Sequence, residues 1–173
     1  MQKLYFSEKK LAGISITALS DGEALKRILL NSALPFDLQA NISRQSDSVL
    51  IETHKQLKEY FFEGRKVFSL PLNPDGSAFQ KSVWAELLNI PYGRTISYKQ
   101  LAEKMGDKNL IRAVGRANAS NPIPIIIPCH RVIGSNGSLV GYSGGMKIKR
   151  YLLELEGVLQ KDFFNSQKKE KPA

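Results

Sequence analysis

The sequence is poor in residues that crosslink a chain or bind a metal. Its 173 residues include one cysteine, Cys129, and two histidines, His54 and His130. One cysteine excludes an internal disulfide, and these three side chains are too few for a structural zinc site. We therefore expect no bound metal. Cys129 is either a buried, inert thiol or a reactive one.

Long apolar runs are also absent. The longest one near Cys129 spans residues 125–127, which is far too short to cross a bilayer, and no basic start is followed by an apolar run of secretory length. We expect a soluble protein without a membrane partner, located in the cytoplasm, or in the nucleus if the organism is a eukaryote.

Positive charge is present in excess and is unevenly distributed. The net charge is +9; residues 1–77 carry 10 Lys and Arg against 9 Asp and Glu, and residues 78–173 carry 15 against 7. The second part is therefore the candidate for binding a polyanion. The alternative is that the charge serves only solubility.

The first part predicts a small α/β or α+β unit. Apolar residues alternate over residues 4–18, as in half-buried strands, and Asp21 predicts the N-cap of a helix over residues 22–30. Helical spacing over residues 47–63 predicts a second helix, and residues 65–70 suit a further strand. His54 is expected as a packed or surface residue of that second helix.

Turn-forming residues over 71–77 coincide with the change in charge, and we place a domain boundary there. The predicted units are an N-terminal α/β domain over residues 1–77, a second domain over 78–160, and a basic, flexible tail over 161–173.

The second domain predicts a helix-turn-helix. An apolar helical face over residues 79–88 is followed by a turn over 91–93, and Ser97 with Gln100 forms a capping box that begins the next helix. That helix should end near Met105. A further helix over residues 109–119 completes the pattern.

The last of these helices carries small residues and two arginines. Ala113 and Gly115 allow close backbone approach, while Arg112 and Arg116 share one face. This combination favours contact with DNA. The alternative is an amphipathic helix with solvated arginines.

A rigid, proline-rich segment leads to a Cys-His pair at residues 129 and 130. Cysteine reacts as thiolate, so a base or a cation such as His130 or Arg131 must lower its pKa. Adjacent residues of an extended chain point apart, so a bridging water would relay the proton to His130. Either Glu154 or Glu156 could orient the histidine, and spacing does not choose between them.

Glycines over residues 134–145 could wrap a flat ligand, with Tyr142 for stacking and Ser143 for hydrogen bonds. A hairpin loop is the alternative.

The run Ile127–Val132 resembles the O6-alkylguanine-DNA alkyltransferase family, also called methylated-DNA-protein-cysteine methyltransferases. Matching segments cover nearly all of residues 78–157, in order. They are Pro91–Gly93, Ile96–Tyr98, Arg112–Gly115, Asn121–Pro122, Gly141–Gly145 and Leu152–Gly157.

The resemblance implies direct-reversal DNA repair. Cys129 would take the alkyl group from guanine O6 by in-line displacement and keep it, so each molecule acts once and needs no cofactor. His130 would be the water-mediated base, Glu156 would orient it, Asn121 would brace the cysteine turn, and Tyr98 would support the departing guanine. Whether O4-alkylthymine is also a substrate is left open.

The implied partner is double-stranded DNA with an alkylated guanine, bound by a monomer through the minor groove, with the damaged nucleotide flipped into a pocket. Arg112 would enter the duplex. The expected DNA-contacting residues are Ser97, Tyr98, Arg112, Ala113, Gly115 and Arg116. The expected pocket residues are Val140, Tyr142, Ser143 and Gly144.

The fold implied is α/β plus α: a ribonuclease-H-like α/β domain followed by a mostly helical, winged-helix-like domain with the helix-turn-helix. Leu110 and Ile111 stand where the family often has small residues, and Asn109 where another family pattern has lysine. These departures bear on groove contact and leave the chemistry intact.

Three alternatives compete with this interpretation. A non-enzymatic alkylated-base sensor would carry another residue in place of Cys129. A DNA-binding transcription regulator would read sequence through the major groove. A cysteine hydrolase would need an oxyanion hole beside the thiol.

Overall fold

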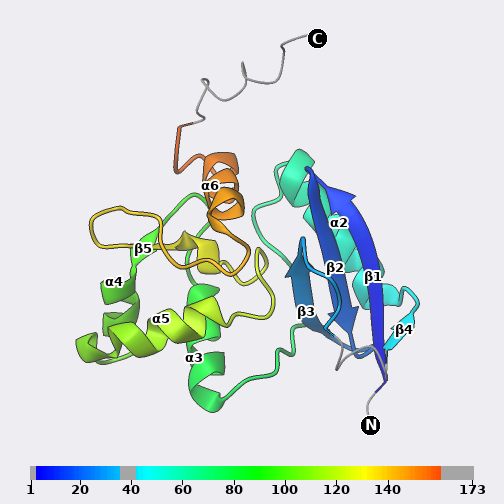
Figure 1. Ribbon diagram of the computed structural model, residues 1–173, viewed down its shortest axis with the longest axis horizontal. Coiled ribbons are helices and arrows are strands. Elements are labelled where there is room, and N and C mark those ends of the chain that lie inside the picture. The colour runs from blue at the N-terminus through cyan, green and yellow to red at the C-terminus, as the bar shows by residue number, and fades with distance from the viewer. Residues whose placement is uncertain (1–2, 36–41, 161–173) are drawn as a thin grey trace.

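The computed structural model describes residues 3–35 and 42–160. A strand-rich N-terminal part and a helical C-terminal part lie side by side, which makes a mixed α/β fold (Figure 1). The predicted tail over residues 161–173 lies outside the described residues. No helix within the described ranges is long and apolar enough to cross a membrane.

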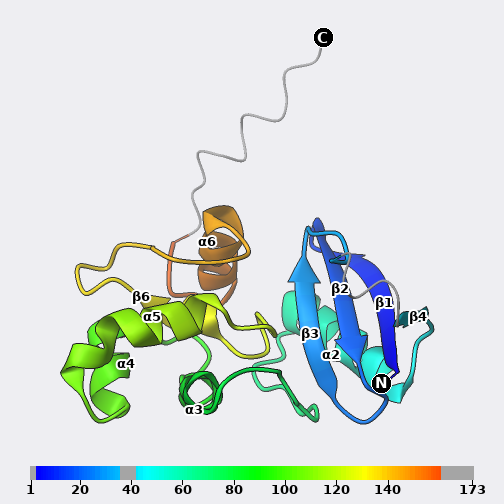
Figure 2. The same ribbon diagram turned by 60° about the horizontal axis from the view of Figure 1, so that its bottom comes forward.

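The N-terminal part is a four-stranded sheet with one helix against it (Figure 2). The strands are β1 (Leu4–Leu11), β2 (Ile14–Ser20), β3 (Leu25–Leu30) and β4 (Ile42–Arg44), in the order β3-β2-β1-β4. β1, β2 and β3 are antiparallel, and β4 pairs parallel with β1. The two predicted strands over residues 4–18 are confirmed as β1 and β2.

The helix predicted over residues 22–30 is wrong, because residues 25–30 form β3. The Asp21 carboxylate accepts hydrogen bonds from the amides of Glu23 and Ala24, 3.0 and 2.8 Å away. An aspartate makes the same local contact in a turn as at a helix N-cap, and pairing with β2 decides the outcome.

The strand predicted over residues 65–70 is also wrong. Only Leu72, further along, makes a single bridge to Leu25, with the Leu25 amide donating to the carbonyl of Pro71. The preceding segment is held instead by a side chain, since Gln56 bonds both the amide and the carbonyl of Ser69.

Helix α2 (Ser48–Phe62) confirms the second predicted helix. The Asp47 carboxylate caps it by accepting from the amide of Leu50, 2.8 Å away. His54 is buried in this helix and hydrogen-bonds Ser7 Oγ, 2.8 Å from its Nε2. It is therefore a packed core residue.

The C-terminal part contains the predicted helix, turn and helix. Its elements are α3 (Ala78–Leu87), β5 (Ile96–Ser97), α4 (Tyr98–Lys104), η1 (Lys108–Leu110), α5 (Ile111–Ala119), η2 (Cys129–Arg131), β6 (Val132–Ile133) and α6 (Met146–Leu155). The capping box of Ser97 with Gln100 is present at α4. Gly106, with φ 95°, makes the turn between α4 and the η1–α5 segment.

Helix α5 is positioned by α3 and α4. The indole nitrogen of Trp84 donates to the carbonyl of Ala117 at 2.8 Å, and Val114 and Ala117 are buried toward the core. This leaves Arg112 and Arg116 on the opposite, exposed face of α5.

Candidate active site

Cys129 opens the short helix η2, at the end of the proline-rich loop. Asn121 braces this loop: its Nδ2 donates to the carbonyl of Ile127 at 2.8 Å, and its Oδ1 accepts from the amide of Ile123 at 3.0 Å. Ile125 is held at φ 75°, a conformation that β-branched residues rarely adopt. Such strain, of about 1–3 kcal/mol, persists only where the surroundings enforce it.

The N-terminal part also holds this loop. The amide of Ile28 in β3 donates to the carbonyl of Pro122 at 2.8 Å. The position of the cysteine thus depends on both parts of the chain.

The two residues that follow Cys129 form a buried polar cluster with Glu156. His130 Nε2 is 2.7 Å from Glu156 Oε1, and Arg131 donates from Nη2 to Oε1 at 3.0 Å and from Nε to Oε2 at 2.9 Å. The Gly93 amide adds a further bond to Oε2 at 3.1 Å. Of the two carboxylates left open by the sequence, Glu156 is the one that meets His130, whereas Glu154 pairs with Arg150.

These contacts assign the protons in the cluster. Bonds from His130 and Arg131 outweigh burial and hold the pKa of Glu156 at about 2, so it is a carboxylate that only accepts. Burial lowers the pKa of His130, so its imidazole is neutral. Nε2 must therefore carry the proton, and Nδ1 is the free basic nitrogen, buried and without a protein partner among the described residues.

The thiol itself is not a resting thiolate. Cys129 is 1% exposed, and burial raises its pKa to about 11, against smaller opposing effects of Asn121 and the charge of Lys149. The sequence suggested that Arg131 lowers the pKa of the thiol, but its side chain donates hydrogen bonds to Glu156 and to the Ile90 carbonyl. The thiol must therefore lose its proton to a base as it reacts.

The charge of Lys149 favours the thiolate form of Cys129. Its Nζ donates to the carbonyls of Val132 and Val140 at 2.6 and 2.7 Å, and burial lowers its pKa to about 8. Sequence reasoning missed this residue, because an exposed and a buried lysine look alike in a helix of mixed pattern. Its only signal is its place next to the buried Ile148.

Tyr98 faces the glycine-rich segment. Its hydroxyl donates to the carbonyl of Val140 at 3.2 Å, and Asn118 Nδ2 lies 3.4 Å both from that hydroxyl and from the carbonyl of Cys129. Asn118 is buried in α5 and links the phenol to the cysteine turn. Sequence reasoning missed it too, since its spacing from Val114 was its only signal.

The predicted pocket residues lie around this point but differ in exposure. Val140 is 43% exposed, whereas Tyr142 is buried with an unpartnered hydroxyl among the described residues. Ser143 and Gly144 line a small cavity of about 100 Å³ together with Asn121.

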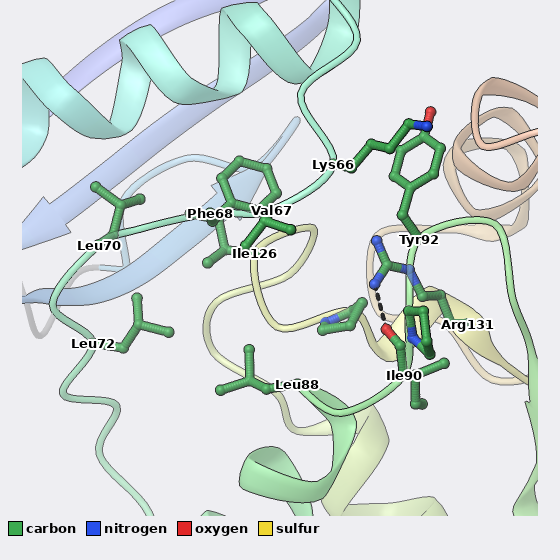
Figure 3. A pocket seen from close by; sticks show the side chains of 12 residues that line it. Lys66, Val67, Phe68, Leu70, Leu72, Leu88, Ile90, Tyr92, Ile126 and Arg131 are labelled. Atoms are coloured by element: carbon green, nitrogen blue, oxygen red, sulfur yellow. Dashed lines mark hydrogen bonds between the residues drawn. The ribbon is translucent and has the colours of Figure 1, made fainter.

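A larger cavity, of about 330 Å³, has Arg131 among the residues that line it (Figure 3). Lys66 and Phe68 from the segment after α2, and Leu88 and Tyr92 from the segment after α3, form its walls. Pro128 and Arg131 line this cavity, whereas Cys129 does not.

The described residues contain no group of three His, Cys, Asp or Glu side chains that could hold a metal.

Known proteins are similar to this chain in sequence and in fold. The model of the 6-O-methylguanine DNA methyltransferase DNA-binding domain matches residues 78–158. A methylated-DNA–protein-cysteine methyltransferase of Methanosarcina acetivorans is 50% identical over 113 residues, which is 65% of this chain and 72% of the relative. The constitutive one of Bacillus subtilis is 46% identical over 123 residues, 70% of this chain and 74% of the relative.

Solved structures of similar proteins have the same fold. The crystal structure of Mycobacterium tuberculosis O6-methylguanine methyltransferase superposes with a TM-score of 0.81 at 35% identity, covering 94% of this chain and 99% of that one. The structure of M. tuberculosis OGT in complex with DNA gives 0.77 at 36% identity, covering 89% and 92%.

Proposed function

Because the chain belongs to the family of methylated-DNA–protein-cysteine methyltransferases, we propose that it repairs DNA by direct reversal and that Cys129 accepts the alkyl group of O6-alkylguanine. One observation carries the role of Cys129: a buried thiol directly precedes a neutral histidine whose far nitrogen is held by a buried carboxylate.

The transfer replaces the bond between the alkyl carbon and O6 by a carbon–sulfur bond and moves the thiol proton to a base. The sulfur attacks the alkyl carbon, the carbon–O6 bond breaks, and the thiol proton passes through a water to Nδ1 of His130. Glu156 keeps Nε2 protonated and stabilises the imidazolium that results. The thioether has no route back to a thiol, so each molecule acts once.

Tyr98 supplies the proton or hydrogen bond that the departing guanine needs. Burial raises the pKa of this phenol, so the hydroxyl remains protonated and able to donate. We assign the flipped base to the surroundings of Val140, Tyr142, Ser143 and Gly144, next to that hydroxyl.

Double-stranded DNA binds, in this proposal, through the minor groove against α5. The exposed face of α5 carries Arg112 and Arg116, and Ala113 and Gly115 keep the helix slim. A Cβ on Gly115 would meet Tyr98 at 3.9 Å, which is ordinary contact, so packing does not demand glycine there. Ser97, which caps α4, would contribute to the same surface.

We also propose two domains, 1–77 and 78–160, acting as a monomer in the cytoplasm, or in the nucleus of a eukaryote, where DNA is found. The strand order β3-β2-β1-β4, with only β4 parallel to β1, favours a ribonuclease-H-like first domain. The α4–α5 pair beside the small β5-β6 sheet favours a winged-helix-like second domain.

Product counting tests the single-use reaction. With a duplex containing O6-methylguanine in excess, restored guanine should reach a plateau at one equivalent per protein molecule. Continued turnover beyond that plateau would instead indicate a hydrolase.

Replacing Arg112 by Ala should slow repair of the duplex about tenfold or more, while reaction with a free O6-alkylguanine base changes little. The reason is that the side chain acts on the duplex and not on the alkyl carbon. The measurement is the rate constant on each substrate. Lys58→Ala, which removes an exposed charge from α2, is the control and should affect neither rate. Equal slowing on both substrates in Arg112→Ala would contradict the proposed role.

A further inference from the structure

The carboxylate of Glu156 has one more hydrogen-bond donor, and it comes from the N-terminal part. Tyr60, in the last turn of α2, donates from its hydroxyl to Glu156 Oε1 at 2.7 Å. Both side chains are buried, Tyr60 with 1% of its surface exposed. This bond joins residues 96 positions apart, in the two parts of the chain.

The direction of this bond follows from the rest of the cluster. Glu156 carries no proton, so the phenol hydrogen must point at Oε1. The same oxygen accepts from His130 Nε2 and Arg131 Nη2. Three donors therefore share Oε1 of Glu156, the oxygen that orients the histidine. Tyr60 competes directly with His130 for the negative charge on this oxygen.

The position of the Tyr60 ring is fixed by aromatic packing. Phe61 and Tyr92 meet it edge-on, with ring centroids 5.3 and 6.1 Å away, and Phe68 lies at 5.5 Å. In Figure 1 the last turn of α2 faces α6, where Tyr151 stacks on Phe61. The hydroxyl thus has little freedom to leave the carboxylate.

We propose that Tyr60 is a positioning residue through which the N-terminal domain sets the basicity of His130. The inference rests on the proposed role of His130 as the base. By donating to Oε1, Tyr60 draws charge from the carboxylate, weakens its pull on the imidazolium, and keeps the imidazole neutral in mildly acidic conditions.

Removing the Tyr60 hydroxyl should raise the pKa of His130, which distinguishes this role from a simple loss of structure. Without the hydroxyl, Glu156 attracts the proton on His130 more strongly, so the pKa of His130 rises. A base with a raised pKa is protonated at higher pH. The acidic limb of the rate profile therefore moves up, while the rate on the alkaline plateau is retained.

The test is Tyr60→Phe in the full chain, which keeps the ring and removes one oxygen. We expect the midpoint of the acidic limb, measured with a free O6-alkylguanine base, to move up by about one pH unit, with a plateau within about twofold of wild type. Nitrogen NMR should report the same upward shift for the His130 imidazole, one of only two histidines in the chain.

The matched control is Tyr151→Phe, which removes a phenol oxygen from the same aromatic cluster at a residue that makes no hydrogen bond to Glu156. It should leave both the midpoint and the His130 titration unchanged. An unshifted His130 titration in Tyr60→Phe, or a rate loss in Tyr60→Phe that is equal at every pH, would overturn the inference. If Tyr60→Phe does not fold, 3-fluorotyrosine at position 60 provides a stronger donor, and the shift should reverse.

The NMR readout separates this inference from the proposed function. A protein that takes up no alkyl group would contradict the proposed function, whatever Tyr60 does. Normal alkyl transfer with an unshifted His130 titration would contradict the role of Tyr60 alone.

Discussion

Replacing Glu156 by Gln should lower the rate of alkyl transfer about 100-fold or more and destabilise the fold by about 3 kcal/mol. The amide cannot balance the buried charge of Arg131, whose side chain is 7% exposed, and it no longer requires a proton on Nε2 of His130. The measurements are the transfer rate and the free energy of unfolding in urea.

The contribution of Glu156 to the free energy of unfolding should depend on pH. The pKa of Glu156 is about 2 in the folded protein and 4.5 by default, so its contribution is complete above about pH 4.5 and is lost as the pH falls toward 2. The wild type should lose more stability over this range than Glu156→Gln does.

Glu154→Gln is the matched control, two residues away. Glu154 pairs with Arg150 across one turn of α6, at 3.6 Å, with the arginine half exposed. Such a pair contributes about 0.5 kcal/mol or less, so neither stability nor rate should change appreciably. If the two variants behaved alike, the assignment of Glu156 over Glu154 would be contradicted.

Replacing Cys129 by Ser should lower alkyl transfer by at least about 1,000-fold while retaining a preference for duplex that contains O6-methylguanine. Serine keeps the shape of the site, but its hydroxyl is a much poorer nucleophile. The bracing contacts of Asn121 to Ile127 and Ile123 do not involve the sulfur and remain. The variant thus becomes a sensor of the damaged base.

Two measurements check this variant: the rate of transfer, and the ratio of its affinities for damaged and undamaged duplex at a stated salt concentration. Transfer at the wild-type rate would place the acceptor on another residue. Loss of the affinity ratio together with the rate would mean that the thiol also recognises the base.

Local signals in the sequence predicted what depends on nearby residues. Ser97 accepts a hydrogen bond from the amide three residues ahead, so the start of α4 could be predicted from a few residues. The failure at Asp21 has the same origin. Its bonds to nearby amides are as local as those of a cap, and only pairing with β2 makes the following residues a strand.

The chemical site was predictable only in part for the same reason. Cys129 and His130 are neighbours in sequence, whereas the choice of Glu156 over Glu154 depends on how α6 is rotated against η2. Tyr60 carries no local signal and Lys149 only its place next to Ile148, because their roles arise when distant segments pack together. The resting pKa of the thiol was missed because burial outweighs the nearby charges.

The intact mass of the protein after incubation with a duplex containing O6-methylguanine shows whether Cys129 accepts the methyl group. We expect the protein to gain one methyl group in place of one hydrogen, located on the peptide that contains Cys129, and unmodified guanine to be left in the DNA. Demethylated DNA alongside a protein of unchanged mass would contradict it.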